Sequence, residues 1–121
     1  MSRSRVLLTG ASGSMGHEAF LELRRRRDDY ATRLLLRPSK VNKKMFAPYA
    51  DESWLEIVWG DLTEAADVDR AVEGVDFVLH PAAMISPAAD RNPSLAYAIN
   101  VGGTQNVVNA ILAQPDGAER I

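Results

Sequence analysis

The 121-residue chain contains no cysteine. Disulfide bonds and thiolate chemistry are therefore excluded, and the composition fits a reducing compartment, so we expect a cytoplasmic protein. Long hydrophobic runs are also missing, because the first apolar stretch, Val6 to Leu8, is soon followed by Gly10. Such a stretch is too short for a secretory signal or a membrane-spanning helix, and we expect no association with a membrane.

The chain also has little net charge and few side chains of the kinds that commonly bind transition metals. The net charge is −2, which provides no positive field for nucleic acid, so we expect no nucleic-acid partner. His17 and His80 are the only histidines, and their separation is not a metal-ligand spacing, so we expect no metal site. The rest, 46% hydrophobic and 25% charged residues, is typical of one soluble globular domain with a modest core.

Four short apolar runs are typical of buried strands. They cover residues 5–9, 31–37, 54–59 and 76–80. Apolar residues at helical spacing predict a helix over residues 14–27 and a second helix that Thr63 can cap and Gly74 ends. Residues 39–53 are expected to form a loop with a short helix, and residues 81–92 a loop. A long helix is predicted from Pro93 to just before Pro115, with a core face of Ala96, Ile99, Gly103, Val107 and Ala110.

This alternation of strands and helices predicts an α/β fold: a doubly wound, Rossmann-type parallel sheet with right-handed crossovers. For the four strands the expected order is 3-2-1-4. Residues 119–121 resemble the approach to a fifth strand. We therefore expect the sheet to be truncated after about four strands.

A glycine-rich turn, Thr9-Gly10-Ala-Ser-Gly13-Ser-Met-Gly16, joins the first strand to the first helix. Gly10 permits a tight turn, Gly13 lets a pyrophosphate approach the backbone, and Gly16 lets helix and strand pack closely. Free N–H groups and the dipole at the helix start favour an anion. Because the turn lies between a strand and a helix, it predicts a dinucleotide site; the alternative is a structural turn in some other α/β domain.

Together with three later segments, this turn resembles the short-chain dehydrogenase/reductase superfamily, in particular its extended branch of epimerases, dehydratases and reductases. The turn matches T-G-x-x-G-x-x-G, and Gly60-Asp61-Leu62 resembles the G-D-L after the third strand. His80-Pro81-Ala82-Ala83 resembles H-x-A-A after the fourth strand, although Pro81 replaces a usually apolar residue. The segment from Asn100 to Val107 resembles N-V-x-G-T-x-N-V in the next helix.

The resemblance implies that residues 1–121 form an NAD(P)-binding domain, and it assigns contacts to a bound NADP or NAD. The pyrophosphate would lie among residues of the glycine-rich turn: Gly10, Ser12, Gly13, Ser14, Met15 and Gly16. Asp61 would accept a hydrogen bond from the adenine amino group, with Leu62 beside the ring; a plain helix-start role is the alternative for Asp61. Ala82 and Ala83 would line the nicotinamide-side ribose. Asn100 is expected to tie the long helix to the sheet near the site.

Basic residues follow the second strand. No acidic residue occurs from Ala31 to Ala50, whereas a carboxylate at the end of this strand would bind the 2′-hydroxyl of NAD. Arg37 can instead present a planar fork to the 2′-phosphate of NADP. The extended-branch reductases that bind NADP carry such an arginine and a downstream lysine, here Lys44. We therefore expect NADP to be preferred over NAD; a solvated basic loop is the alternative.

The catalytic Tyr-x-x-x-Lys pair of the superfamily, in which lysine lowers the pKa of the tyrosine, does not occur. The residues four positions after the three tyrosines are Leu34, Ser53 and Val101. No catalytic residue is assigned, and we expect the chain to be the N-terminal part of a longer, homo-oligomeric enzyme. That enzyme would be an epimerase or dehydratase of a sugar nucleotide, or a carbonyl reductase, with hydride transfer to or from nicotinamide. The alternative is a non-catalytic NADP-binding sensor or scaffold.

Two groups of residues are expected to be purely structural. The arginines Arg24 to Arg27 at the end of the first helix complement its dipole and should be solvated. Trp54 and Trp59 flank the third strand, and we expect them to cover the core or the sheet edge.

Overall fold

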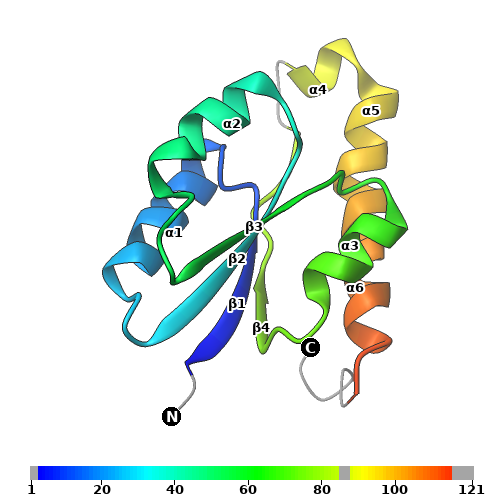
Figure 1. The fold of residues 1–121 in the computed structure, drawn as a ribbon. Helices are drawn as coiled ribbons and strands as arrows, with labels where there is room; N and C mark the ends of the chain where they lie inside the picture. Colours follow the sequence, from blue (N-terminus) through cyan, green and yellow to red (C-terminus); the bar gives the residue numbers. More distant parts are fainter. Residues whose placement is uncertain (1–2, 85–87, 116–121) are drawn as a thin grey trace.

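A four-stranded parallel sheet forms the centre of the computed structural model, which describes residues 3–84 and 88–115 (Figure 1). The strands are β1 (Ser4–Thr9), β2 (Tyr30–Leu36), β3 (Leu55–Trp59) and β4 (Phe77–Leu79), in the order β3-β2-β1-β4. The predicted Rossmann-type fold and strand order are thus confirmed. The expected fifth strand at 119–121 lies outside the described residues.

Helices α1 (Ser14–Arg25) and α2 (Lys40–Phe46) cover one face of the sheet (Figure 1). Phe20 of α1 and Phe46 of α2 are fully buried, and their rings meet edge to face with centroids 5.1 Å apart. They pack on alternate residues of β1 and β2: Val6, Leu8, Leu34 and Leu36. A 3₁₀ turn over Ala47–Tyr49 follows α2, so the short helix expected within residues 39–53 is present.

Helix α3 (Ala65–Val72) and the long helix after β4 cover the opposite face. Leu7 and Leu35 point to this side, and they pack with residues from both helices: Val68, Ala71, Val72, Val107 and Ala110. Because both faces of β1 are covered, its apolar residues are buried without alternation. This explains the uninterrupted apolar run in the sequence.

The predicted long helix is present, but its middle part is π-helical. It comprises α5 (Pro93–Tyr97), a π-helical segment (Ala98–Gly103) and α6 (Thr104–Leu112). A four-residue helix, α4 (Ala88–Arg91), lies within the stretch predicted to be a loop. A π segment widens the helix by one residue and occurs frequently at functional sites.

The start of α3 corrects another expectation. The capping position is Glu64, not Thr63, and no side chain caps this helix. The hydroxyl of Thr63 instead donates to Asp61 Oδ1 at 2.8 Å. The end of α3 is capped from the sheet, because the buried Arg33 of β2 donates to the carbonyl oxygens of Ala71 (2.7 Å) and Glu73 (2.6 Å). A cation at this position also complements the helix dipole.

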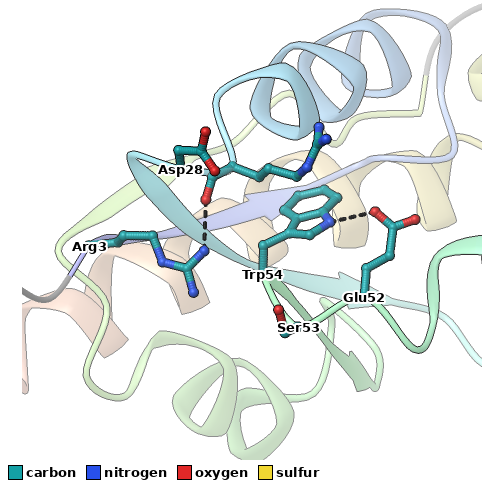
Figure 2. Close-up of a pocket in the computed structure, with 6 residues that line it drawn as sticks. Arg3, Asp28, Glu52, Ser53 and Trp54 are labelled. Atoms are coloured by element: carbon teal, nitrogen blue, oxygen red, sulfur yellow. Dashed lines mark hydrogen bonds between the residues drawn. The ribbon is translucent and has the colours of Figure 1, made fainter.

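The amino edge of the sheet carries a depression of about 270 Å³ (Figure 2). Its lining combines two cations and two carboxylates: Arg3, Arg27, Asp28, Glu52, Ser53 and Trp54. Arg3 Nη1 donates to the carbonyl oxygen of Arg27 at 2.7 Å. The charges thus balance, and this edge is opposite to the one where the predicted site residues lie.

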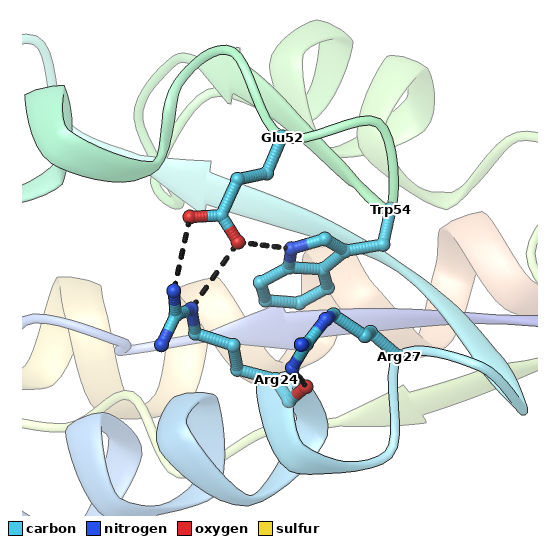
Figure 3. A network of polar contacts seen from close by, with 4 residues as sticks. All are labelled: Arg24, Arg27, Glu52 and Trp54. Atoms are coloured by element: carbon cyan, nitrogen blue, oxygen red, sulfur yellow. Dashed lines mark hydrogen bonds and ion pairs between the residues drawn. The ribbon is translucent and has the colours of Figure 1, made fainter.

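Beside this depression, Arg24 connects α1 to the segment that leads into β3 (Figure 3). Its Nε and Nη2 donate to the Glu52 carboxylate at 3.2 and 3.3 Å, and Trp54 Nε1 donates to the same group at 2.7 Å. These bonds, that from Arg24 first, lower the pKa of Glu52. The expectation that the whole arginine run is simply solvated is therefore wrong for Arg24, because Arg24 is paired with Glu52. Local sequence patterns could not predict this pair, since the two residues are 28 positions apart.

The two tryptophans differ in environment. Trp54 precedes β3 and is buried in the core, whereas Trp59 ends the strand and is partly exposed. The Nζ of Lys43 lies 5.8 Å from the Trp59 ring centroid. Trp54 therefore covers the core, as expected, whereas for Trp59 a covering role stays a prediction. None of the described helices combines the length and the apolar composition that a membrane-spanning segment requires.

Candidate functional site

The predicted site residues gather at one edge of the sheet. Because the four strands are parallel, their carboxyl ends share this edge. Along it lie, in spatial order, Asp61 and Leu62 after β3, Arg37 after β2, the glycine-rich turn after β1, and Ala82 and Ala83 after β4. The connections after β1 and β4 diverge to opposite faces, which is where open α/β sheets bind ligands.

Two glycines of the turn are required by the fold itself. Gly10 has φ +70°, and a β-carbon there would stand 2.7 Å from Cα of Ala82. A β-carbon on Gly16 would stand 1.8 Å from the carbonyl oxygen of Gly10. These contacts bring the turn against both α1 and the loop after β4, as close packing at the first and third glycines demands.

Gly13 is different, because neither its conformation nor its packing requires glycine. Its φ of −82° and ψ of 171° are accessible to any residue. The only atom near an added β-carbon, among the described residues, would be the carbonyl oxygen of Gly10 at 3.4 Å. Gly13 is also exposed. The missing side chain leaves open space at the start of α1.

This space lies in front of unpaired backbone donors. Gly13 precedes the first residue of α1, and no side chain caps the helix. Within the described part of the chain, the first three amides of the helix, at Ser14, Met15 and Gly16, donate no hydrogen bond. Ser12 and Ser14 are exposed, and the Met15 side chain is 76% exposed. Such an uncapped 12-residue helix can bind an anion through its N–H groups and dipole.

Arg37 lies in a turn that its own neighbours fix. Its carbonyl oxygen accepts from Asn42 Nδ2 at 2.9 Å and from the Ser39 amide at 2.8 Å. The guanidinium is exposed and has no hydrogen bond or ion pair within residues 3–84 and 88–115. Lys44 is likewise exposed on α2, without a bond to the Arg37 turn. The fork of Arg37 is therefore free to bind an anionic group.

Asp61 closes the turn after β3 instead of starting a helix. Its Oδ1 accepts from the Thr63 amide at 2.9 Å and from the Thr63 hydroxyl at 2.8 Å. Its own amide donates to Asp67 Oδ2 at 2.9 Å. The helix-start alternative for Asp61 is thus wrong, and among the described residues Oδ2 has no hydrogen-bond partner. The turn lies beside the end of β2, because Gly60 N donates to Leu36 O at 2.9 Å.

Leu62 is held in place by the long helix. Asn106 Nδ2 donates to the Leu62 carbonyl oxygen at 3.0 Å. The helix can approach because position 103 is glycine: a β-carbon on Gly103 would stand 2.8 Å from Leu62 Cγ. The orientation of Leu62 therefore depends on a helix that begins about 30 residues later, as the α/β crossover dictates.

Asn100 fastens the loop that follows β4. Its Oδ1 accepts from the Met84 amide at 2.7 Å, and its Nδ2 donates to the Met84 carbonyl oxygen at 2.9 Å. The tie expected of Asn100 therefore exists, although it reaches the loop next to Ala82 and Ala83 instead of the strand. The π segment contains Asn100 and precedes Thr104, so it presents both residues to this region.

Sequence reasoning missed a set of hydrogen bonds centred on His80. Thr9 Oγ1 lies 2.7 Å from His80 Nδ1, and Thr104 Oγ1 lies 3.0 Å from His80 Nε2. Burial lowers the pKa of His80. The only sequence signal was that Thr9, His80 and Thr104 each belong to one of the matched motifs.

Comparisons with known proteins agree with this geometry. Residues 6–121 match the model of the NAD dependent epimerase/dehydratase family. A 3 beta-hydroxysteroid dehydrogenase/Delta 5→4-isomerase of Mycobacterium tuberculosis is 32% identical over 123 aligned residues, covering 96% of this chain and 30% of that protein.

Solved structures are similar over the same region. Pen from Bacillus thuringiensis has a TM-score of 0.78 at 27% identity, covering 93% of this chain and 34% of its own. A short-chain dehydrogenase/reductase superfamily protein from Agrobacterium tumefaciens, with bound NAD, has a TM-score of 0.64 at 30% identity, covering 88% of this chain and 28% of its own. The chain thus spans about a third of the length of these proteins.

Proposed function

Because the chain belongs to the NAD-dependent epimerase/dehydratase family, we propose that it forms the cofactor-binding part of an oxidoreductase or epimerase-type enzyme. The observation that carries this proposal is Gly13, a glycine that the fold does not need. It leaves room beside the free amides of α1. A pyrophosphate fits this room, because it is anionic and needs close approach to the backbone.

The rest of the edge supports an extended dinucleotide. Asp61 Oδ2 and Leu62 are available on one side of the glycine-rich turn for an adenine ring, and Ala82 and Ala83 on the other for the nicotinamide-side ribose. Small side chains at the latter positions leave space for a sugar. A bound nicotinamide supplies hydride transfer. The residues of this chain would hold the adenine end and the nicotinamide end of the dinucleotide on either side of the glycine-rich turn.

We also propose that the cofactor is NADP in preference to NAD. The free guanidinium of Arg37 supports this preference, since a planar fork matches a 2′-phosphate. Lys44 would add charge from α2. No acidic residue occurs from Ala31 to Ala50 that could bind the ribose hydroxyl instead.

For the whole protein, the proposed reaction is epimerisation or dehydration of a sugar nucleotide, or reduction of a carbonyl group. The name of the Mycobacterium tuberculosis relative adds a hydroxysteroid to the candidate substrates. A cytoplasmic location and a homo-oligomeric state stay predictions. Two exposed side chains of β4 support a further covering element or subunit: Phe77, 56% exposed, and Leu79, 44% exposed.

Replacing Gly13 by alanine tests the cofactor proposal in the full-length protein. The Gly13→Ala variant should change its free energy of unfolding by no more than about 1 kcal/mol, because the lower entropy of the unfolded chain is offset by the poor preference of alanine for an N-cap position. It should nevertheless bind NADP⁺ and NAD⁺ at least about tenfold more weakly, because the methyl group takes up the phosphate space. Isothermal titration calorimetry measures the affinities, and urea unfolding measures the stability.

Gly102→Ala is the matched control. Position 102 is helical, and no described atom lies within 4 Å of an added β-carbon, so this variant should bind both dinucleotides normally. Unchanged affinity in Gly13→Ala, or no dinucleotide binding by the wild-type protein, would contradict the proposal. Retained binding without turnover of any sugar nucleotide, ketone or hydroxysteroid would favour the sensor alternative.

A further inference from the structure

The residues around His80 form one continuous chain of hydrogen bonds. It starts at the Ala82 amide, which donates to Thr9 Oγ1 at 3.4 Å. It continues from Thr9 to His80 Nδ1 at 2.7 Å, and from His80 Nε2 to Thr104 Oγ1 at 3.0 Å. It ends where the Thr104 hydroxyl donates to the Asn100 carbonyl oxygen at 2.7 Å. The chain therefore connects β1, β4 and the long helix.

The two hydroxyl groups determine the tautomer of His80. Thr104 uses its single proton to donate to Asn100, so its oxygen must accept from His80 Nε2. Nε2 therefore carries the proton, and Nδ1 accepts from the Thr9 hydroxyl. The Thr9 oxygen in turn accepts from the Ala82 amide. In a protonated imidazole Nδ1 would also carry a proton, so it could no longer accept from the Thr9 hydroxyl and would instead donate to it.

The first member of this series of hydrogen bonds, Ala82, belongs to the loop that is proposed to face the nicotinamide-side ribose. Ala82 also lies directly against Gly10, where a β-carbon would meet it at 2.7 Å. On the far side, Asn100 holds Met84 by two hydrogen bonds. His80 thus lies between the two supports of this loop, one on β1 and one on the long helix.

We propose that His80 is a positioning residue: its neutral imidazole, protonated at Nε2, sets Ala82 and Ala83 against the glycine-rich turn for the nicotinamide half of the cofactor. The inference rests on the proposed function of this edge as a dinucleotide site. The adenosine half has separate supports, since Asp61 is bonded to Thr63 and Arg37 to Asn42. Loss of the His80 bonds should therefore act on one end of the ligand only.

Comparing whole dinucleotides with nucleotides that lack the nicotinamide half tests this separation. In the full-length protein, His80→Phe keeps a planar ring but removes both hydrogen bonds. We expect it to bind NADP⁺ and NAD⁺ about tenfold more weakly, and 2′,5′-ADP and ADP within about twofold of wild type. Calorimetric titration gives each affinity. A uniformly damaged fold would weaken all four ligands equally.

Two conservative variants separate the arms of the chain and cover the case in which His80→Phe does not fold. In His80→Asn, the amide oxygen can take the place of Nδ1 and accept from Thr9. In His80→Gln, the amide nitrogen can take the place of Nε2 and donate to Thr104. Because the Thr9 arm leads to Ala82, His80→Asn should recover more dinucleotide affinity than His80→Gln.

Asn109→Ala, at an exposed position of α6, should leave every affinity unchanged. Equal losses for dinucleotides and nucleotides, or no loss in any His80 variant, would overturn the positioning role. Failure of the wild-type protein to bind any of the four ligands would instead overturn the proposed function.

Discussion

Gly10 and Ala82 touch through their backbones, so closely that a β-carbon on Gly10 would stand 2.7 Å from Cα of Ala82. The first residue lies after β1 and the second after β4. The contact means that the proposed pyrophosphate-binding turn and the proposed nicotinamide-side loop form one surface. A side chain at position 10 would therefore press on the loop after β4.

Gly10→Ala should therefore lower the free energy of unfolding by more than the strain of placing alanine in a left-handed backbone conformation. Gly74 provides the comparison, because its φ is +76° but an added β-carbon would meet only Arg5 Nη1, at 3.8 Å. We expect Gly74→Ala to lose about 1–2 kcal/mol of unfolding free energy, and Gly10→Ala a further ~1–3 kcal/mol from overpacking. Urea unfolding measures both, and equal losses would show that the loop after β4 simply moves away.

Replacing two buried threonines by valine should change the stability of the fold in opposite directions. Thr32, 2% exposed, has a hydroxyl without a hydrogen-bond partner in the described structure. Thr32→Val removes that unpaired group and should stabilise the fold by about 1 kcal/mol. Thr9, 1% exposed, bonds to His80, so Thr9→Val should destabilise it by about 1–3 kcal/mol. Thermal unfolding measures the two shifts; a destabilised Thr32→Val would mean that the hydroxyl has a partner after all.

Arg37→Ala should discriminate between the two dinucleotides. A charge-assisted hydrogen bond contributes roughly 1.5–3 kcal/mol, so NADP⁺ affinity should fall about 10- to 150-fold while NAD⁺ affinity barely changes. Arg37→Lys keeps the charge without the fork and should recover only part of the loss. Equal losses for NADP⁺ and NAD⁺ in calorimetric titration would refute the proposed NADP preference.

His80 should make stability depend on pH. Its pKa in the folded protein lies below its usual value because of burial, and the groups that it faces are the uncharged Thr9 and Thr104 hydroxyls. As the pH falls below about 6.5, the unfolded chain takes up a proton that folded His80 resists. Its contribution is complete above that pH and is lost as the pH falls through the folded pKa.

The measurement is urea unfolding of wild type and His80→Asn between pH 5 and pH 8. The wild-type advantage should shrink toward acid pH, since asparagine does not titrate. A constant difference between the two proteins would show that His80 keeps the same pKa on folding.

The order of elements could be predicted from local patterns. Apolar runs and helical spacing depend only on neighbouring residues, and right-handed crossovers leave few ways to arrange four parallel strands. Where element boundaries are concerned, local reasoning failed: Thr63 does not cap α3, because the capping position is Glu64 and the Thr63 hydroxyl donates to Asp61. The π segment was also missed, because π turns are rare and occur mostly as single turns inside α-helices.

For the candidate site, too, some features followed from the sequence and others only from the tertiary structure. The sequence by itself determined which residues follow each strand, and hence that Gly10 to Gly16, Arg37, Asp61 and Ala82 share one edge. Only the tertiary structure decided which of them the fold needs for itself: Gly10 and Gly16 pack on backbone, whereas Gly13 faces open space. It alone also placed Arg33 at the end of α3 and joined Thr9 to His80 across 71 positions. Such partners are chosen by how the crossovers bring distant strands and helices together, which no local pattern encodes.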